Sequence, residues 1–406
     1  MRLNHIYISN YKNLEQADVS FSPCVNCFVG SNGMGKTNLL DAIYYLSFCK
    51  SSTNPSDAFN MRHGSDFFMI KGQYETDGGV DMKISCGVKT GAKKRVRCDG
   101  KDYKRLSQHV GRIPLVMVSP SDSALVSGGS EERRRMMDSV ISQYRPAYLE
   151  SIIKYDKALK QRNAALKSEA EPAWDVVDVL EEIMSGEAEL IFRERKAFVE
   201  EFVPIFRDIY RNICPENAAE DIDIGYESHG LRGNLKPLLE QGRAIDRAVG
   251  YTRHGVHKDE LVLLLNGYPV KREASQGQTK TYFIALKLAQ YIFLKGKGER
   301  NMPILLLDDI FDKLDAKRVG RIVNFVSGGD FGQTFITDTN RENIDRILAS
   351  TTEQYSLFEV ENGEVDLITS GVEGRENART EVQNATLDKI GDIIDKGAER
   401  EGGDEA

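Results

Sequence analysis

Two kinds of hydrophobic pattern alternate along the chain and predict two kinds of element. Short, largely apolar runs at residues 25–29 and 302–307 are typical of strands buried on both faces of a parallel sheet. Residues 37–46, directly after the first run, place apolar side chains at helical spacing. A strand, a glycine-rich turn and a helix in this order predict an α/β fold.

A longer stretch, from about residue 120 to residue 235, favours helices. Apolar positions recur there at heptad-like spacing on both sides of a turn signal near residues 168–172. This pattern predicts an antiparallel helical arm of about two to three heptads per side. An ordinary helical subdomain packed on the α/β part fits the same pattern. The positions are Ile152, Tyr155, Leu159 and Leu166, then Val177, Leu180, Met184, Ala188, Ile191, Phe198 and Phe202.

The glycine-rich turn fits the P-loop pattern G-x-x-x-x-G-K-[ST]. In such a turn, backbone N–H groups converge on phosphates at the positive end of the following helix. Lys36 would reach the β- and γ-phosphates of ATP, and the Thr37 hydroxyl would ligate Mg²⁺. The alternative is a tight turn without a ligand, although a turn alone does not require Gly-Lys-Thr. The predicted ATP-binding residues here are Gly30, Ser31, Asn32, Gly33, Met34, Gly35, Lys36, Thr37 and Asn38.

Two carboxylates, Asp308 and Asp309, follow the second apolar run. The carboxyl ends of strands are where ligands bind in open α/β sheets. We expect Asp308 to hold Mg²⁺, directly or through water, and Asp309 to orient or deprotonate the attacking water. Asp309 and Lys36 are therefore the predicted catalytic residues. A solvated strand end that happens to carry aspartates is the alternative interpretation.

Composition narrows the class of protein. Of the 406 residues, 40% are apolar and 29% are charged, which are ordinary globular values. No apolar stretch approaches the roughly 18 residues of a membrane span, and the N-terminus lacks a signal-peptide core. The six cysteines are scattered, and Cys24-x-x-Cys27 has no further zinc ligands at useful spacing. We therefore expect a cytoplasmic protein with reduced cysteines and no membrane partner.

The net charge is −8, which at first argues against a protein that binds nucleic acid, but the distribution of charge weakens that objection. Residues 371–406 hold 5 Lys/Arg and 10 Asp/Glu, so −5 of the −8 lies in this segment, which we predict to be a mostly disordered tail. Residues 93–105 instead crowd seven basic residues around the hairpin signal Asp99-Gly100. Lys93, Lys94, Arg95 and Arg97 are candidate contacts to a DNA backbone. A solvated, lysine-rich edge that deters aggregation explains them equally well.

Ser275-Gln276-Gly277-Gln278 resembles the signature motif of ABC-type ATPases. Further blocks resemble the RecF family of the SMC/ABC-type ATPase superfamily over roughly residues 1–365. They lie at residues 1–3 and 11–14, 120–122 and 133–138, 155–163, 254–261, 311–315 and 333–337.

Some positions depart from the family pattern. Lys12 stands where arginine is expected, and Asp312 where serine or alanine is usual. Transporter ATPases carry glutamate at the position of Asp309 and a histidine near Thr337. The shorter carboxylate and the missing histidine suggest slow hydrolysis.

The resemblance implies an α/β, P-loop ABC-type ATPase lobe (1–119 and 236–370) interrupted by a helical arm domain (120–235). ATP and Mg²⁺ would join two lobes into a homodimer, with Ser275, Gly277 and Gln278 of one subunit contacting the nucleotide of the other. The family's function implies an ATP-dependent DNA clamp in recombinational repair and replication-fork maintenance. Such a clamp binds gapped or junction DNA, single- and double-stranded, and helps RecO and RecR to load RecA. The expected activity is weak, DNA-stimulated ATP hydrolysis.

Three other functions fit parts of this pattern. They are an SMC-like structural ATPase, the ATPase subunit of an ABC transporter, and a nucleotide-gated scaffold with negligible turnover.

Overall fold

The computed structural model describes residues 1–213, 220–298, 301–311, 314, 316–326, 330–350 and 354–371. The predicted tail, apart from Gly371, and Asp312 lie outside these residues. Residues 1–369 form one compact unit. None of the described helices combines the length and the apolar character that a bilayer-spanning segment needs.

A six-stranded sheet carries both predicted apolar runs. Its central strands are parallel and entirely buried, which explains their uninterrupted apolar sequences and confirms the expectation of an α/β fold. In spatial order the strands are β15 (Glu364–Ser370), β14 (Tyr355–Glu361), β3 (Val25–Val29), β13 (Thr334–Asp338), β12 (Ile304–Asp308) and β8 (Leu115–Val118).

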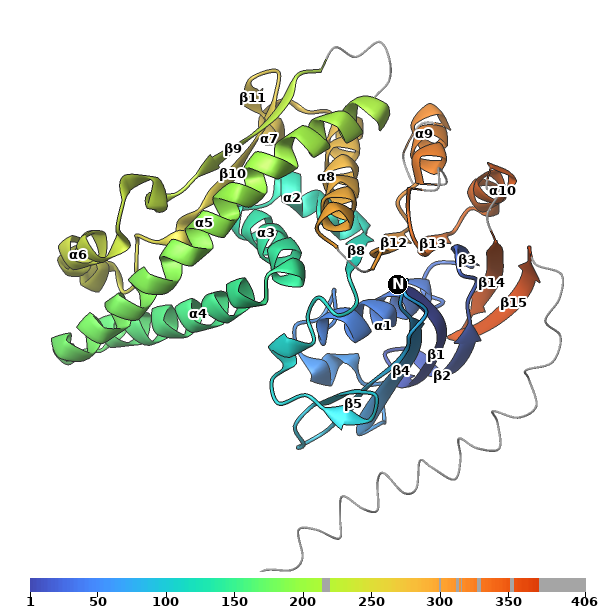
Figure 1. The fold of residues 1–406 in the computed structure, drawn as a ribbon, viewed down its shortest axis with the longest axis horizontal. Helices are drawn as coiled ribbons and strands as arrows, with labels where there is room; N and C mark the ends of the chain where they lie inside the picture. Colours follow the sequence, from blue (N-terminus) through green and yellow to red (C-terminus); the bar gives the residue numbers. More distant parts are fainter. Residues whose placement is uncertain are drawn as a thin grey trace, which may run out of the picture. The chain divides into compact units, whose positions relative to one another are not determined.

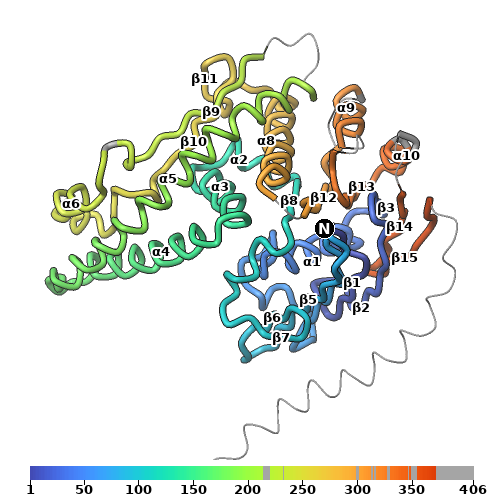
Figure 2. The backbone as a smooth tube through the Cα atoms, in the orientation of Figure 1, coloured from blue at the N-terminus to red at the C-terminus, as the bar shows by residue number. Residues whose placement is uncertain are grey.

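A second six-stranded sheet is antiparallel. Its order is β2 (Leu14–Ser20), β1 (Arg2–Tyr11), β4 (Phe67–Glu75), β5 (Asp81–Lys89), β6 (Arg95–Cys98) and β7 (Lys101–Asp102). Helix α1 (Lys36–Phe48) contacts strands of both sheets and lies between them (Figure 1). Strands β6 and β7 lie side by side (Figure 2) and pair antiparallel. Asp99 and Gly100, between them in sequence, both adopt positive φ, which confirms the predicted hairpin turn.

Helices dominate the segment between β8 and residue 213. Their bounds are α2 (Ala124–Ser127), α3 (Ser130–Tyr144), α4 (Pro146–Lys167) and α5 (Trp174–Ile213). Three ion pairs, Arg145–Glu194, Lys154–Glu187 and Arg162–Glu181, show that α4 and α5 run antiparallel, as the heptad-like spacing predicted. Most of the apolar positions that carried this prediction are buried.

The remaining elements connect the helices to the lobe. A three-stranded antiparallel sheet joins β9 (Ile222–Glu227), β10 (Glu260–Leu265) and β11 (Tyr268–Pro269). It crosses the boundary expected between residues 235 and 236, and the division into lobe and arm stays a prediction. The other helices are α6 (Leu235–Val249), α7 (Val270–Glu273), α8 (Gln276–Lys297), α9 (Ala316–Val326) and α10 (Arg341–Ser350). Short 3₁₀ turns are η1 (Asp57–Asn60), η2 (Leu106–Gln108), η3 (Pro120–Ser123), η4 (His229–Arg232) and η5 (Val256–Lys258).

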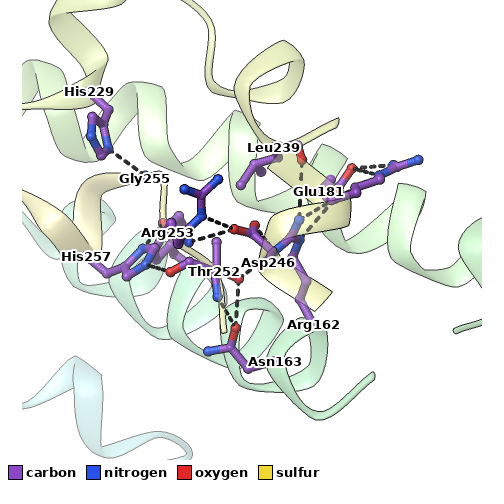
Figure 3. A network of polar contacts seen from close by, with 12 residues as sticks. Arg162, Asn163, Glu181, His229, Leu239, Asp246, Thr252, Arg253, Gly255 and His257 are labelled. Carbon is purple, nitrogen blue, oxygen red and sulfur yellow. Dashed lines mark hydrogen bonds and ion pairs between the residues drawn. The ribbon is translucent and has the colours of Figure 1, made fainter. Parts of the chain in front are cut away.

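A buried arginine ties three helices together (Figure 3). Arg162 of α4 is 0% exposed and donates to Glu181 of α5 at 3.0 Å and to Asp246 of α6 at 2.9 Å. It also donates to the Thr252 hydroxyl at 2.7 Å. Because a buried charge is tolerated only when its partners are in place, this cluster fixes how α4, α5 and α6 pack.

Arg162→Met should lower the free energy of unfolding by about 3 kcal/mol, because methionine leaves Glu181 and Asp246 buried without their shared cation. Urea unfolding followed by circular dichroism measures the change. Lys157→Met is the matched control, since Lys157 is exposed on the same helix. Equal stability of the two variants would show that the buried cluster does not hold the helices together.

Candidate nucleotide-binding site

The turn between β3 and α1 has a backbone that only glycine accommodates. Gly30, Gly33 and Gly35 have φ values of 152°, 82° and 118°. A Cβ on Gly30 would lie 2.3 Å from the carbonyl oxygen of Val360. The glycine spacing of the sequence motif therefore has a steric cause in this structure.

The turn is supported from outside by two loops that the sequence motif does not contain. The Gly363 N–H donates to the Met34 carbonyl at 2.9 Å, from the turn between β14 and β15. Asn13 accepts a hydrogen bond from Asn38 at 2.7 Å and donates to the Gly33 carbonyl at 3.4 Å. These contacts hold the P-loop open toward solvent, where Ser31, Asn32 and Gly33 are exposed.

Lys36 lies over the P-loop. Its ammonium donates to the carbonyl oxygens of Gly30 at 2.6 Å and of Ser31 at 2.9 Å. Burial lowers the pKa of Lys36, and the nearby carboxylates of Asp309 and Asp308 oppose that shift. The structure thus places a cation where the phosphates of a nucleotide would lie in a P-loop.

Asp308, at the end of β12, meets the P-loop helix. Its Oδ1 accepts from the Thr37 hydroxyl at 2.9 Å and from the Thr337 hydroxyl at 2.8 Å. Burial raises the pKa of Asp308, while the hydroxyls of Thr337 and Thr37 oppose the rise. A hydroxyl and a carboxylate are oxygen ligands of the kind that Mg²⁺ takes alongside substrate phosphates, so these residues fit the predicted metal.

Asp309 follows in the left-handed region, with φ of 49°. Its N–H donates to the Thr337 carbonyl and hydroxyl oxygens, each at 3.1 Å. Groups of three or more His, Cys, Asp or Glu side chains able to hold a metal are absent from the described residues.

The signature residues begin α8. Ser275 is the N-cap: its hydroxyl accepts from the Gln278 N–H at 3.2 Å, and its own N–H donates to the Gln278 side chain at 2.7 Å. Gln278 also donates to Glu220 at 2.8 Å. A Cβ on Gly277 would lie 2.7 Å from the Arg318 guanidinium. Ser275 is exposed at a helix N-terminus, where anions are stabilised.

The four candidate DNA contacts differ in their surroundings. Lys93 and Arg95 are exposed. Arg97 pairs with Asp102 at 2.9 Å. Lys94 points inward, donating to the Cys49 carbonyl at 2.7 Å and pairing with Asp57 at 2.8 Å. Only Lys93 and Arg95 have the exposure that a phosphate contact needs, and the assignment of all four stays a prediction.

Three positions near the site were not assigned a role from the sequence. Thr337 was noted only because transporter ATPases carry a histidine near this position, yet its hydroxyl donates to the Asp308 carboxylate and accepts from the Asp309 N–H. Lys12 stood out only as a departure from arginine, and it forms an ion pair with the buried Asp41 of α1. Asn13 braces the P-loop. Polar residues at strand ends were the available signal, but their partners lie far away in sequence.

Comparison with known proteins gives consistent matches. The family model described as RecF/RecN/SMC N terminal domain matches residues 2–365. The DNA replication and repair protein RecF of Phocaeicola vulgatus is 54% identical over 365 residues, covering 90% of this chain and 98% of the relative. RecF of Bacteroides thetaiotaomicron is 53% identical over 366 residues, with the same shares covered.

Solved structures agree with these matches. The recombination mediator protein RecF-ATP in the RecFOR pathway superposes with a TM-score of 0.80 at 27% identity, covering 91% of this chain and 98% of that one. An SMC head bound to the C-terminal winged-helix domain of ScpA has a TM-score of 0.56 at 14% identity, covering 91% and 97%, and shares the fold alone.

Asp309→Asn should reduce ATP turnover by about a hundredfold while ATP still binds, because an amide cannot accept a proton from water. Asp308→Asn should instead weaken Mg²⁺-dependent nucleotide binding, since it removes an anionic ligand. Single-turnover hydrolysis and titration with a fluorescent ATP analogue, with and without Mg²⁺, separate the two effects. Identical behaviour of the two variants would refute this division of roles.

Proposed function

The chain belongs to the RecF family, within the wider group of RecF, RecN and SMC proteins, and we propose that it works as an ATP-dependent DNA clamp in repair. It is an ATP-binding ATPase of the RecF/SMC type with a role in the RecFOR repair pathway. Dimerisation on ATP, use of Mg²⁺ and stimulation by DNA are the parts that we add.

The contact between Thr37 and Asp308 is the observation that carries the proposal. It joins the P-loop helix to the end of β12 at 2.9 Å, across 271 residues of sequence. Lys36 lies on the same turn, and Asp309 follows Asp308 directly. A phosphate-binding cation, two oxygen ligands for a metal and a second carboxylate thus lie together, as phosphoryl transfer to water requires.

Each residue has a separate part in the proposed hydrolysis. Lys36 binds the β- and γ-phosphates, and Mg²⁺, when bound by Thr37 and Asp308, neutralises charge on the phosphate oxygens. Asp309 orients water for attack on the γ-phosphate and accepts its proton, while the bond from the γ-phosphorus to the bridging oxygen breaks and ADP leaves. The side chain of Asp309 is one methylene shorter than that of glutamate, which supports slow turnover. Slow hydrolysis suits a clamp, whose lifetime on DNA it would set.

The signature supports a composite site between two copies of the chain. Ser275 and Gln276, at the N-terminus of α8, are exposed, and a helix N-terminus is where a phosphate could be bound. In the proposed homodimer, they contact the γ-phosphate held by the partner's P-loop. Two nucleotides would then lie in equivalent positions across a two-fold axis.

DNA binding is proposed for the exposed part of the basic hairpin. Lys93 and Arg95 lie on or next to β6, and they can track a phosphate backbone without reading sequence. We propose for this chain the function of its family. It would bind gapped or junction DNA, with RecO and RecR as partners, and would help to load RecA.

Ser275→Arg should abolish ATP-dependent dimers and reduce turnover at least about tenfold, because it places a bulky cation where the opposing phosphate must dock. ATP binding to the monomer should persist. Sedimentation velocity with and without ATP, together with nucleotide titration, measures both. If Ser275→Arg dimerises on ATP like the wild type, the composite site is wrong.

Mixing this variant with Lys36→Arg supplies the control for folding. Lys36→Arg alone should be inactive, because arginine keeps the charge but not the compact geometry of the ammonium. In a mixed dimer, one of the two equivalent sites combines an intact P-loop with an intact signature, so activity should return to at most about half of the wild-type value.

Reversal of the two exposed hairpin cations, Lys93→Glu with Arg95→Glu, should weaken DNA binding and flatten its salt dependence. Two lost phosphate contacts should lower the log–log salt slope by about two. ATP hydrolysis without DNA should not change, since the hairpin lies outside the nucleotide motifs. The measurement is a salt titration of duplex and gapped duplex, with and without ATP.

The matched control is Lys157→Glu with Lys160→Glu, two exposed lysines of α4. Equal losses in both double variants would attribute the effect to net charge. Unchanged binding in the hairpin variant would leave the hairpin as a solvated edge.

A further inference from the structure

Thr337 occupies a special position in the central sheet. It lies near the carboxyl end of β13, in register with Asp308 on the neighbouring parallel strand, and it is 0% exposed. Threonine in a buried strand is commonly explained by its branched shape. Here, however, the hydroxyl is aimed at the site rather than at the core.

The Thr337 hydroxyl connects the two strand-end acids. It donates to Asp308 Oδ1 at 2.8 Å and accepts from the Asp309 N–H at 3.1 Å. One side-chain oxygen therefore contacts the carboxylate expected to hold the metal and the backbone of the carboxylate expected to orient water.

The contact from Thr337 supports a strained backbone conformation at Asp309. Its φ of 49° lies in the left-handed region, which residues other than glycine adopt at a cost. The Thr337 carbonyl and hydroxyl oxygens both accept from its N–H. They hold the strained turn, and with it the direction in which the Asp309 carboxylate leaves the strand.

Thr37 cannot substitute for this support. Its hydroxyl also donates to Asp308 Oδ1, at 2.9 Å, but the same hydroxyl is the expected metal ligand. The contact from Thr337 comes from a neighbouring strand of the sheet and does not depend on the nucleotide. Asp308 therefore has one hydroxyl partner that belongs to the P-loop and one that belongs to the sheet.

We propose that Thr337 is a positioning residue for hydrolysis, whose hydroxyl fixes the Asp308 carboxylate and the Asp309 turn together. The proposal rests on the proposed ATPase function and adds a residue to it. Thr337 touches neither nucleotide nor water in this scheme. Its loss should leave ATP recognition by the P-loop largely intact and should impair the use of Mg²⁺ and the chemical step.

Thr337→Val tests the hydroxyl, because valine keeps the branched shape and removes only the polar atom. We expect kcat to fall about tenfold or more, as for outer-shell partners of metal ligands, with a smaller change in KM for ATP. Mg²⁺-dependent binding of a fluorescent ATP analogue should weaken, whereas Mg²⁺-independent binding should not. Thr337→Ser should restore both properties to within about threefold of the wild type.

Thr334→Val is the matched control on the same strand. Thr334 is also buried, but its hydroxyl donates to the Gly332 carbonyl at 3.2 Å, at the opposite end of β13. Its replacement should leave kcat and Mg²⁺ dependence unchanged. If Thr337→Val loses its folded state in thermal unfolding, Thr337→Ala and Thr337→Ser, which differ by one hydroxyl, make the same comparison.

The outcomes separate this proposal from the proposed function. Wild-type kcat and Mg²⁺ dependence in Thr337→Val would overturn the positioning role while leaving the ATPase assignment intact. A folded Thr337→Ser that fails to recover would overturn it as well. If the wild type itself does not hydrolyse ATP, the proposed function fails, and unchanged Mg²⁺-dependent binding in Thr337→Val would then refute the contact with Asp308 independently.

Discussion

The Asp308 carboxylate is the point on which the site depends. It is almost fully buried, and hydroxyls from two other elements donate to the same oxygen, Thr37 from the P-loop helix and Thr337 from β13. A buried carboxylate without donors would be costly, and Thr37, one of its two donors, is also the residue proposed to hold the metal with it. The contact thereby sets the distance between the phosphate-binding turn and the acidic strand end.

The surrounding architecture explains why this contact can form. Helix α1 lies between the parallel and the antiparallel sheet. Because α1 begins shortly after β3 ends, its N-terminus lies at the carboxyl edge of the parallel strands. Phe28 stacks on Phe358 with ring centroids 5.0 Å apart, joining β3 to β14 beneath the P-loop. The turn after β14 then reaches the Met34 carbonyl. The pairing and packing of β3 and β14 therefore shape both the core of the parallel sheet and the turn that carries the P-loop.

Buried charge has the same role in the helical part. Arg162 joins α4, α5 and α6, and Arg195 of α5 pairs with Asp259 at 2.7 Å and Asp138 at 2.9 Å. Such clusters contribute little net stability compared with apolar packing, but they penalise every other arrangement of the helices. This favours a defined orientation for α8, which packs on α5 and starts with the signature.

The sequence by itself determined the features whose cause is local. Glycine spacing predicts the P-loop because the turn needs positive φ at Gly33 and Gly35, and continuous apolar runs predict buried parallel strands. Asp308 and Asp309 follow from their place after such a strand. Only the tertiary structure decided which partners these residues have, including Thr337 on Asp308 and Asp57 on Lys94. The reason is physical: strand register and the layering of sheets bring together residues from about thirty positions apart, as in these two pairs, to 271 positions apart, as in Thr37 and Asp308, and no local pattern encodes that register.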